Sequence, residues 1–252
     1  MGEENTKIEN GRYYKEIALV YNHLMRSIDY KGWAKYIKYL HDESKSGGDD
    51  ILELAAGTCS VAKYLYKDYP KIIATDLSFQ MLSMNLENSF NRVCCNMLNL
   101  PFKNKYNFVF STFDSINYLI TESDVRQLLN EVGVSLYDDG CFTFDVSLEK
   151  NSLKYVKSLN RKGKCEGIKY IQYSDYDKES RIHTNSFKIM LSNGKIVEEV
   201  HKQRIYDIYD YFNLVDECGF YVEHCFDAFT FDQVHDNSER AQFLIKKKCK
   251  HA

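Results

Sequence analysis

Polar side chains stand at or near the ends of the apolar runs in the first half of the chain. Glu53 lies in the run 51–54, and Asp76 ends the next run, 23 residues after Glu53. Asn96 and Asp114 follow a third and a fourth run. Carboxylate and amide oxygens accept hydrogen bonds from hydroxyl and amino groups of a ligand. Because ligands of open α/β sheets bind at the carboxyl ends of the strands, this spacing predicts one shared binding site.

The turn after the first apolar run is built from small residues, with Ala55, Gly57 and Cys59 at alternate positions. Small side chains leave the backbone accessible to a ligand. A dinucleotide site would need Gly-x-Gly-x-x-Gly, and a triphosphate loop would end in Gly-Lys-Ser/Thr. Neither pattern is present in this turn. The turn therefore favours a ligand that does not place a phosphate against a helix N-terminus.

Composition narrows the class of protein. The chain has 252 residues, of which 44% are hydrophobic and 27% charged, a balance typical of a globular α/β domain. A formal net charge of −3 gives no general footprint for nucleic acid. The eight cysteines contain no Cys-x-x-Cys, so we expect no metal site. No long apolar run or secretory segment is evident, and we expect a cytoplasmic protein without a membrane partner.

Alternating strands and helices predict an α/β fold with a seven-stranded, mostly parallel sheet and helices on both faces. Strands are expected at 51–54, 71–75, 92–95, 107–111, 141–146, 220–229 and 241–246. Helices are expected at 60–67, 78–87, 123–137 and 208–218. The segment 138–140 is expected to form a turn before the fifth strand.

Two further segments depart from this alternation. Residues 1–48 contain apolar residues at helical spacing and are expected to cover the site as N-terminal helices. Residues 151–204 contain period-two segments and the hairpin signal Asn193-Gly194, so we expect a small inserted antiparallel sheet that forms a lid. The α/β domain itself would then comprise residues 49–150 and 205–252.

Several stretches, taken together, resemble a known family. Residues 53–59 resemble motif I of the class I S-adenosylmethionine (SAM)-dependent methyltransferases, with Ala55, Gly57 and Cys59 at the three usual glycine positions. The stretches at 74–78 and 95–98 resemble the family's ribose-binding and adenine-binding segments. Residues 17–33, 114–118 and 199–204 resemble small-molecule methyltransferases related to aminosugar N-methylating enzymes. The resemblance spans residues 13–248.

The resemblance implies SAM as cofactor and S-adenosylhomocysteine (SAH) as product. The residues expected to contact the cofactor are Tyr21, Trp33, Glu53, Ala55, Gly57, Asp76, Leu77, Met81, Asn96, Met97 and Phe113. Cys59 departs from the family pattern and is expected to narrow the space near the amino-acid end of SAM. Singly, Asp76 is equally consistent with a helix cap and Asn96 with a turn residue. Four such motifs on successive strand ends favour the cofactor site.

The expected reaction is methyl transfer to a small-molecule acceptor, on nitrogen or on oxygen. Asp114, Tyr118 and His201 are the candidates for holding the acceptor or accepting its proton. The alternative for His201 is structural, with Glu199, His201 and Arg204 pairing to fix the lid. The second hypothesis is a SAM- or SAH-binding module without catalysis. It rests on three departures from the family pattern: Cys59 stands at a usual glycine position, and Asn96 and Asn22 each stand where an aspartate is usual. An RNA or protein methylase is disfavoured by the absence of a basic stripe.

Overall fold

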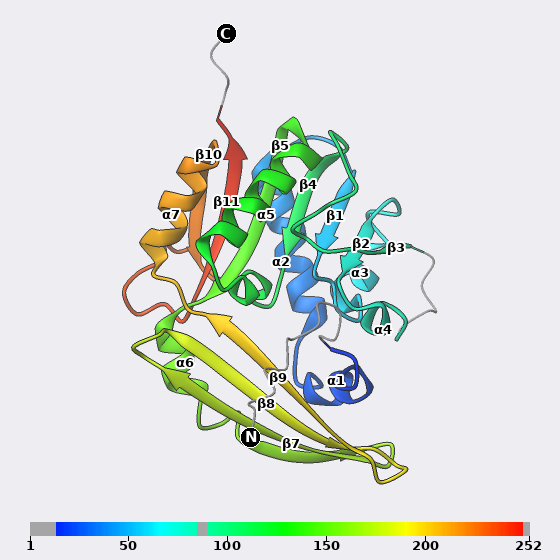
Figure 1. Ribbon diagram of the computed structural model, residues 1–252. Coiled ribbons are helices and arrows are strands. Elements are labelled where there is room, and N and C mark those ends of the chain that lie inside the picture. The colour runs from blue at the N-terminus through cyan, green and yellow to red at the C-terminus, as the bar shows by residue number, and fades with distance from the viewer. Residues whose placement is uncertain (1–13, 85–89, 249–252) are drawn as a thin grey trace, which may run out of the picture.

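The fold is described here from a computed structural model, which covers residues 14–84 and 90–248 (Figure 1). In these residues seven strands form one sheet in the order β10-β11-β5-β4-β1-β2-β3. The strands are β1 Ile51–Leu54, β2 Ile73–Asp76, β3 Asn91–Cys94, β4 Tyr106–Ser111, β5 Leu136–Ser147, β10 Phe220–Asp227 and β11 Arg240–Lys247. Only β11 runs antiparallel to its neighbours. The expected seven-stranded, mostly parallel sheet is confirmed.

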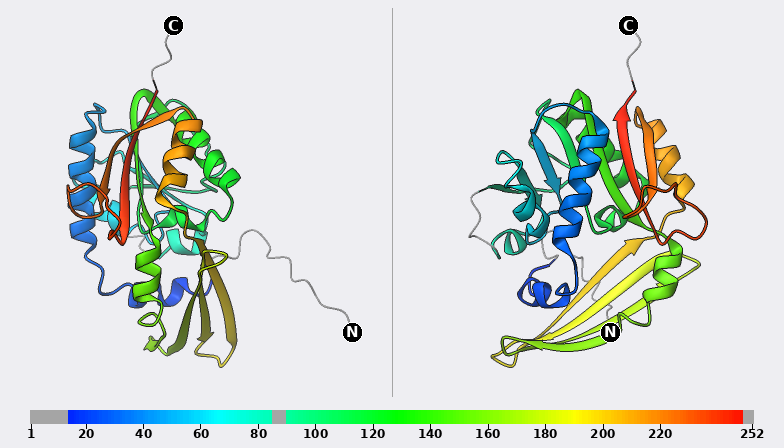
Figure 2. Two further views of the ribbon diagram at one scale, coloured as in Figure 1. Left: turned by 90° about the vertical axis from the view of Figure 1, so that its left-hand side faces the viewer. Right: turned by 180° about the vertical axis from the view of Figure 1, so that it is seen from behind.

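Helices cover both faces of this sheet (Figures 1 and 2). Helices α2 Tyr30–Ser44 and α3 Ser60–Leu65 pack on one face, and α5 Glu122–Ser135 and α7 Ile208–Glu217 pack on the other. Strand β1 is buried throughout because it lies between these two layers, which explains its continuous apolar sequence. None of the helices in the described ranges is long and apolar enough to cross a membrane.

Local signals account for most helix starts. Thr121 forms a capping box with Asp124 at the start of α5, and Asp207 does the same at the start of α7. Helix α4 spans only Phe79–Leu82, and residues 85–87 of the longer expected helix lie outside the described residues. The turn expected at 138–140 was wrong. Strand β5 begins at Leu136, which pairs with Tyr106, and pairing resumes between Phe108 and Cys141, so residues 137–140 form an irregularity within β5.

A second sheet of four antiparallel strands is inserted between β5 and α7. It contains β6 Arg161–Cys165, β7 Ile168–Asp177, β8 Ile182–Met190 and β9 Ile196–Arg204 in that order, and we call it the lid sheet. Gly194 in the β8–β9 hairpin has a φ of 82°, which its missing side chain permits. Helix α6, Glu149–Tyr155, leads into the lid sheet and was not expected. The lid sheet lies on the side to which the arrow of β1 points (Figure 1).

Helix α1, Ala18–Leu24, is bonded to the lid sheet. Both amides that precede it, those of Glu16 and Ile17, donate to Oε1 of Glu199 in β9 at 2.8 Å. Burial opposes the charge of Glu199, but the hydrogen bonds from His201 and from the two amides lower its pKa. Apolar side chains of α1 and of the residue before it pack with apolar side chains of β7 and β8. The cluster contains Ile17, Val20 and Leu24 on one side and Tyr170, Phe187 and Ile189 on the other.

We predict that Glu199→Ala lowers the free energy of unfolding by about 2 kcal/mol, because two backbone donors lose a charged acceptor. The neighbouring Glu198→Ala is the control, since Glu198 is 68% exposed and pairs only with Lys188 at the surface. This control should change stability by less than about 0.5 kcal/mol. Denaturant unfolding of both variants measures the difference. Equal stability of the two variants would show that the Glu199 contact does not hold α1.

Candidate functional site

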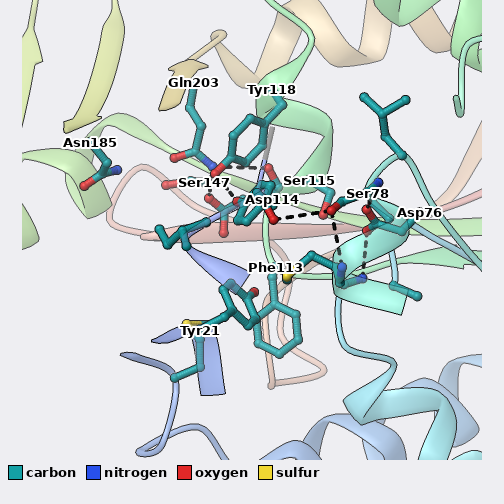
Figure 3. Close-up of a pocket in the computed structure, with 18 of the residues that line it drawn as sticks. Tyr21, Asp76, Ser78, Phe113, Asp114, Ser115, Tyr118, Ser147, Asn185 and Gln203 are labelled. Carbon is teal, nitrogen blue, oxygen red and sulfur yellow. Dashed lines mark hydrogen bonds between the residues drawn. The ribbon is translucent and has the colours of Figure 1, made fainter. Parts of the chain in front are cut away.

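A cavity of about 980 Å³ lies where the carboxyl ends of β1, β2, β3 and β4 face α1 and the lid sheet (Figure 3). Strand order reverses between β1 and β4, which is where open α/β sheets bind ligands. Ligand pockets generally have volumes of roughly 300–1,000 Å³, so this cavity is at the upper end. It has room for two small ligands side by side.

The loop after β1 forms one wall of the cavity. Ala55, Gly57 and Cys59 have φ values of 51°, 55° and 59°, the left-handed conformation that glycine adopts most easily. A Cβ on Gly57 would lie 3.3 Å from Cε of Met81, so this position has little space for a side chain. Cys59 is buried in the core between α2 and α3 and does not line the cavity. The expectation that Cys59 narrows the cofactor site is therefore corrected.

Asp76 joins the loops that follow β1 and β2. Its Oδ2 accepts a hydrogen bond from the N–H of Gly57 at 2.8 Å, and its Oδ1 accepts one from the N–H of Ser78 at 2.7 Å. Burial raises the pKa of Asp76, although these amides favour its charged form. The hydroxyl of Ser78 caps α4 at the N–H of Met81. Asp76 therefore organises the turn and still lines the cavity, where each oxygen has a second lone pair.

The walls beyond Asp76 are mainly apolar. Leu77, Met81, Asn96 and Met97 line the cavity, as expected for them as site residues. Oδ1 of Asn96 accepts a hydrogen bond from the N–H of Leu98 at 2.9 Å. Asn96 is thus a turn residue at the cavity wall, and its contact with the cofactor stays a prediction.

Aromatic residues close the cavity on the side of α1. Tyr21 and Phe113 line it, and both are labelled in Figure 3. Trp33 does not line the cavity, which corrects the expectation that it lies over the cofactor. The Trp33 ring packs 4.5 Å from the ring of Phe113 and 4.4 Å from that of Phe229, because α2 presents it to the core. Trp33 therefore supports Phe113 from behind.

The expected cofactor contact of Glu53 is also corrected. Glu53 does not line the cavity, because alternation along β1 turns its side chain toward the layer of α2 and α3. It is 1% exposed, its carboxyl group interacts with the N–H of Ala62, and Oε2 is buried without a hydrogen bond. Burial raises the pKa of Glu53 well above its usual value.

Asp114 lies in a network of buried charges. Its Oδ1 accepts from Nη2 of Arg240 at 2.8 Å, and its Oδ2 accepts from Nε2 of Gln203 at 2.5 Å. The N–H of Asp114 donates to Oδ2 of Asp145 at 2.9 Å, and Arg240 also donates to that oxygen. We call these four residues the Asp114 network. The side chain of Asp145 is fully buried.

The Asp114 network combines two carboxyl groups with one guanidinium. Burial raises the pKa of Asp145 to about 6, although the charge of Arg240 opposes this shift. Because the network holds two carboxyl groups and one guanidinium, its formal charge is negative when both carboxyl groups are ionised. Sequence reasoning missed Arg240 and Asp145, because no local motif marks them, and it noted the stretch 199–204 without assigning Gln203 to the site. In the described ranges, no group of three or more His, Cys, Asp or Glu residues is placed to hold a metal ion.

Tyr118 also lines the cavity, and its hydroxyl lies 2.5 Å from the hydroxyl of Tyr14. Burial raises the pKa of Tyr14 well above its usual value, and the neighbouring Tyr118 adds to this. The phenol of Tyr14 is therefore neutral at physiological pH. The pair connects the segment before α1 to the 3₁₀ helix Ser115–Tyr118 that follows β4.

His201 does not line the cavity, which corrects the expectation that it faces the acceptor. It is 2% exposed, and its Nε2 lies 3.4 Å from Oε2 of Glu199. Its ring packs 4.5 Å from the ring of Tyr14. The structural alternative fits this geometry for His201 and Glu199. Arg204 is not part of it, because its guanidinium donates to the carbonyl of Ser180.

Comparisons with known proteins agree with this geometry. A family model described as "Methyltransferase domain" matches residues 51–140. A protein of Geobacillus sp. (strain WCH70) that is named as a methyltransferase is 29% identical over 246 residues, which cover 93% of this chain and 99% of that protein. The structure of a SAM-dependent methyltransferase from Clostridium acetobutylicum ATCC 824 matches with a TM-score of 0.76 at 23% identity, covering 94% of this chain and 99% of the other. The sugar N-methyltransferase KedS8 from Streptoalloteichus sp ATCC 53650 matches with a TM-score of 0.74 at 16% identity, covering 99% of each chain.

We predict that Glu53→Gln gains stability relative to the unchanged protein as the pH rises. A carboxyl group whose pKa is raised by folding stabilises the fold below its unfolded pKa and loses that contribution as it ionises. The neutral amide has no such loss. Thermal unfolding between pH 5 and pH 8 tests this, with the exposed Glu179→Gln as control. A gap between Glu53→Gln and the unchanged protein that is constant with pH would mean that Glu53 does not titrate in the fold.

Proposed function

Because the chain belongs to the class I SAM-dependent methyltransferases, we propose that its cavity binds SAM along the ends of β1, β2 and β3 and a small-molecule acceptor under the lid sheet. The observation that carries this proposal is the placement of Asp76. Its carboxylate is fixed by two backbone amides at the tip of β2 and lines the cavity beside Gly57. A carboxylate held there can accept hydrogen bonds from both hydroxyls of a ribose.

The residues along this half of the cavity fit the parts of SAM. Leu77 and Met97 offer apolar walls for an adenine ring, beside the amide of Asn96. Ala55 and Gly57 expose backbone where the phosphate-free linkage to the amino-acid end would pass. When bound, SAM supplies a methyl group on a positively charged sulfur. The negative Asp114 network would stabilise that positive charge electrostatically.

We further propose that the acceptor atom is an amine nitrogen. A hydroxyl acceptor would need a general base, whereas a neutral amine needs only to be held and to release a proton afterwards. Asp114 is ion-paired with Arg240 and hydrogen-bonded to Gln203, so protein donors hold its carboxylate in place. His201 is buried away from the cavity, and Tyr118 shares its hydroxyl with Tyr14. The similarity to a sugar N-methyltransferase structure supports the proposal at the level of the fold.

The three departures from the family pattern do not favour a module without catalysis. Cys59 points into the core, and Asn96 lines the cavity as a turn residue. Asn22 accepts a hydrogen bond from the hydroxyl of Thr58 at 3.2 Å, which ties α1 to the loop after β1. None of these three residues therefore blocks the cavity.

Removing the Asp76 carboxylate should weaken SAM binding. We expect Asp76→Ala to lower affinity by tenfold or more, since hydrogen bonds to a charged group contribute about 1.5–3 kcal/mol and 1.4 kcal/mol is one decade. Asp68→Ala is the matched control, because Asp68 is 51% exposed and pairs with Lys38 far from the cavity wall. Calorimetry with SAM on both folded variants gives the comparison. Unchanged affinity in Asp76→Ala would reduce Asp76 to a turn residue.

The nature of the acceptor atom can be tested at Tyr118. With any amine that the enzyme methylates, Tyr118→Phe should lower turnover by less than about tenfold, because no proton has to be removed by a base in the cavity. Loss of a general base typically costs roughly 10²–10⁴-fold. The assay follows SAH release at saturating SAM. A loss of more than 100-fold with unchanged SAM affinity would assign Tyr118 as a base and contradict the proposal that the acceptor needs none.

A further inference from the structure

The half of the cavity farthest from Asp76 is lined by polar side chains of the lid sheet. Arg161 in β6, Gln172 in β7 and Asn185 in β8 all line it. Figure 3 shows Asn185 on the opposite side of the cavity from Asp76, with Asp114 between them. None of the three has a place in the cofactor site or in the Asp114 network. They belong to the region where an acceptor would extend beyond its reacting atom.

Hydrogen bonds link these three side chains in a fixed direction. Nε of Arg161 donates to Oε1 of Gln172 at 2.8 Å, and Nε2 of Gln172 donates to Oδ1 of Asn185 at 3.0 Å. A guanidinium can only donate, so the oxygen of Gln172 must face it and the amide N–H of Gln172 must face Asn185. This order leaves the NH₂ group of Asn185 and the terminal nitrogens of Arg161 for other partners. We call this chain the Arg161 relay.

Both free ends of the Arg161 relay are donors. Neither the terminal nitrogens of Arg161 nor the NH₂ group of Asn185 bonds to another residue in the described ranges. Gln172 at the centre is 4% exposed, so its two neighbours are held in one orientation. A ligand group that satisfies this arrangement must accept hydrogen bonds.

The positive charge of Arg161 narrows the ligand group from any hydrogen-bond acceptor to an anion. No carboxylate in the described residues pairs with Arg161, whereas Arg240 contacts two. Burial lowers the pKa of Arg161; the neighbouring Tyr170 opposes this shift, and the charge of Arg26 adds to it. A half-buried cation without a counter-ion is costly, and a carboxylate or phosphate can bind a guanidinium through two parallel hydrogen bonds.

We infer that the Arg161 relay binds a negatively charged group of the methyl acceptor, either a carboxylate or a phosphate. This inference rests on the proposed function. The negative Asp114 network would then face the amine of the same molecule, and the Arg161 relay its anionic group. The acceptor class is an amine that carries an acidic group. The Asp114 network would hold its amine, and the Arg161 relay would hold its acidic group.

Binding of simple anions to the SAH-saturated full-length protein tests the inference. Phosphate and acetate are titrated at constant ionic strength and followed by calorimetry, so the two arms distinguish the two kinds of anion. Arg161→Gln should weaken binding of the preferred anion by at least tenfold. Lys162→Gln, at the next residue of β6 and exposed, should leave it unchanged within twofold. SAH affinity should be the same in all three proteins.

A second variant keeps the test valid if Arg161→Gln does not fold. Asn185→Asp retains an oxygen for Gln172 and places a negative oxygen toward the anion, so it should abolish anion binding. Equal anion affinity in the unchanged protein and either folded variant, with SAH still bound, overturns the inference and leaves the cofactor site standing. Failure of SAH to bind the unchanged protein overturns the proposed function instead.

A panel of amines gives an independent result on turnover. Each amine is compared with the same amine carrying a carboxylate or a phosphate, and SAH release is measured. The acidic member of each active pair should be methylated at least tenfold more efficiently, and Arg161→Gln should remove most of that preference. Equal rates within every active pair would contradict the inference.

Discussion

The ion network of Asp114, Asp145 and Arg240 is the interaction that holds together the strand ends around the part of the cavity under the lid sheet. Asp114 and Arg240 are separated by 126 positions in the chain, and their contact joins the end of β4 to the start of β11. Asp145 connects both of them to β5. Gln203 extends the network to the last strand of the lid sheet. Removing one partner from such a buried pair typically costs about 3–5 kcal/mol, because the remaining charge is left without compensation.

The same network gives the cavity its distribution of charge. Its net negative charge lies between the carboxylate of Asp76 on one side and the cationic Arg161 relay on the other. A positively charged sulfur and an amine are both favoured beside the network, and an acidic group is favoured at the lid sheet. The hydrogen bonds from the backbone amides at the start of α1 to Glu199 hold α1 against the lid sheet. Binding of cofactor and acceptor is therefore expected to involve one connected set of elements.

The sequence was informative where local patterns decide the structure. Continuous apolar runs predicted the buried strands, and Asn193-Gly194 predicted the hairpin of the lid sheet. Asp76 was identified because a carboxylate that follows a parallel strand lies at the edge where ligands bind. The positions of Trp33, Glu53 and His201 were missed for a common reason. Periodicity shows that a side chain lies on one face of an element, but packing decides whether that face meets the cavity or the core. Arg240 could not be found at all, since its partners are distant in sequence.

A crystal structure of the protein with SAH tests the central claim, that the ends of β1, β2 and β3 hold the cofactor, most directly. We predict density in the cavity with both ribose hydroxyls within hydrogen-bond distance of Asp76, the adenine between Leu77 and Met97, and the sulfur on the side of Asp114. SAH at this place would establish the cofactor site and leave the part of the cavity under the lid sheet for the acceptor. Well-ordered SAH bound elsewhere, or a cavity without SAH in crystals grown at saturating concentration, would contradict the account.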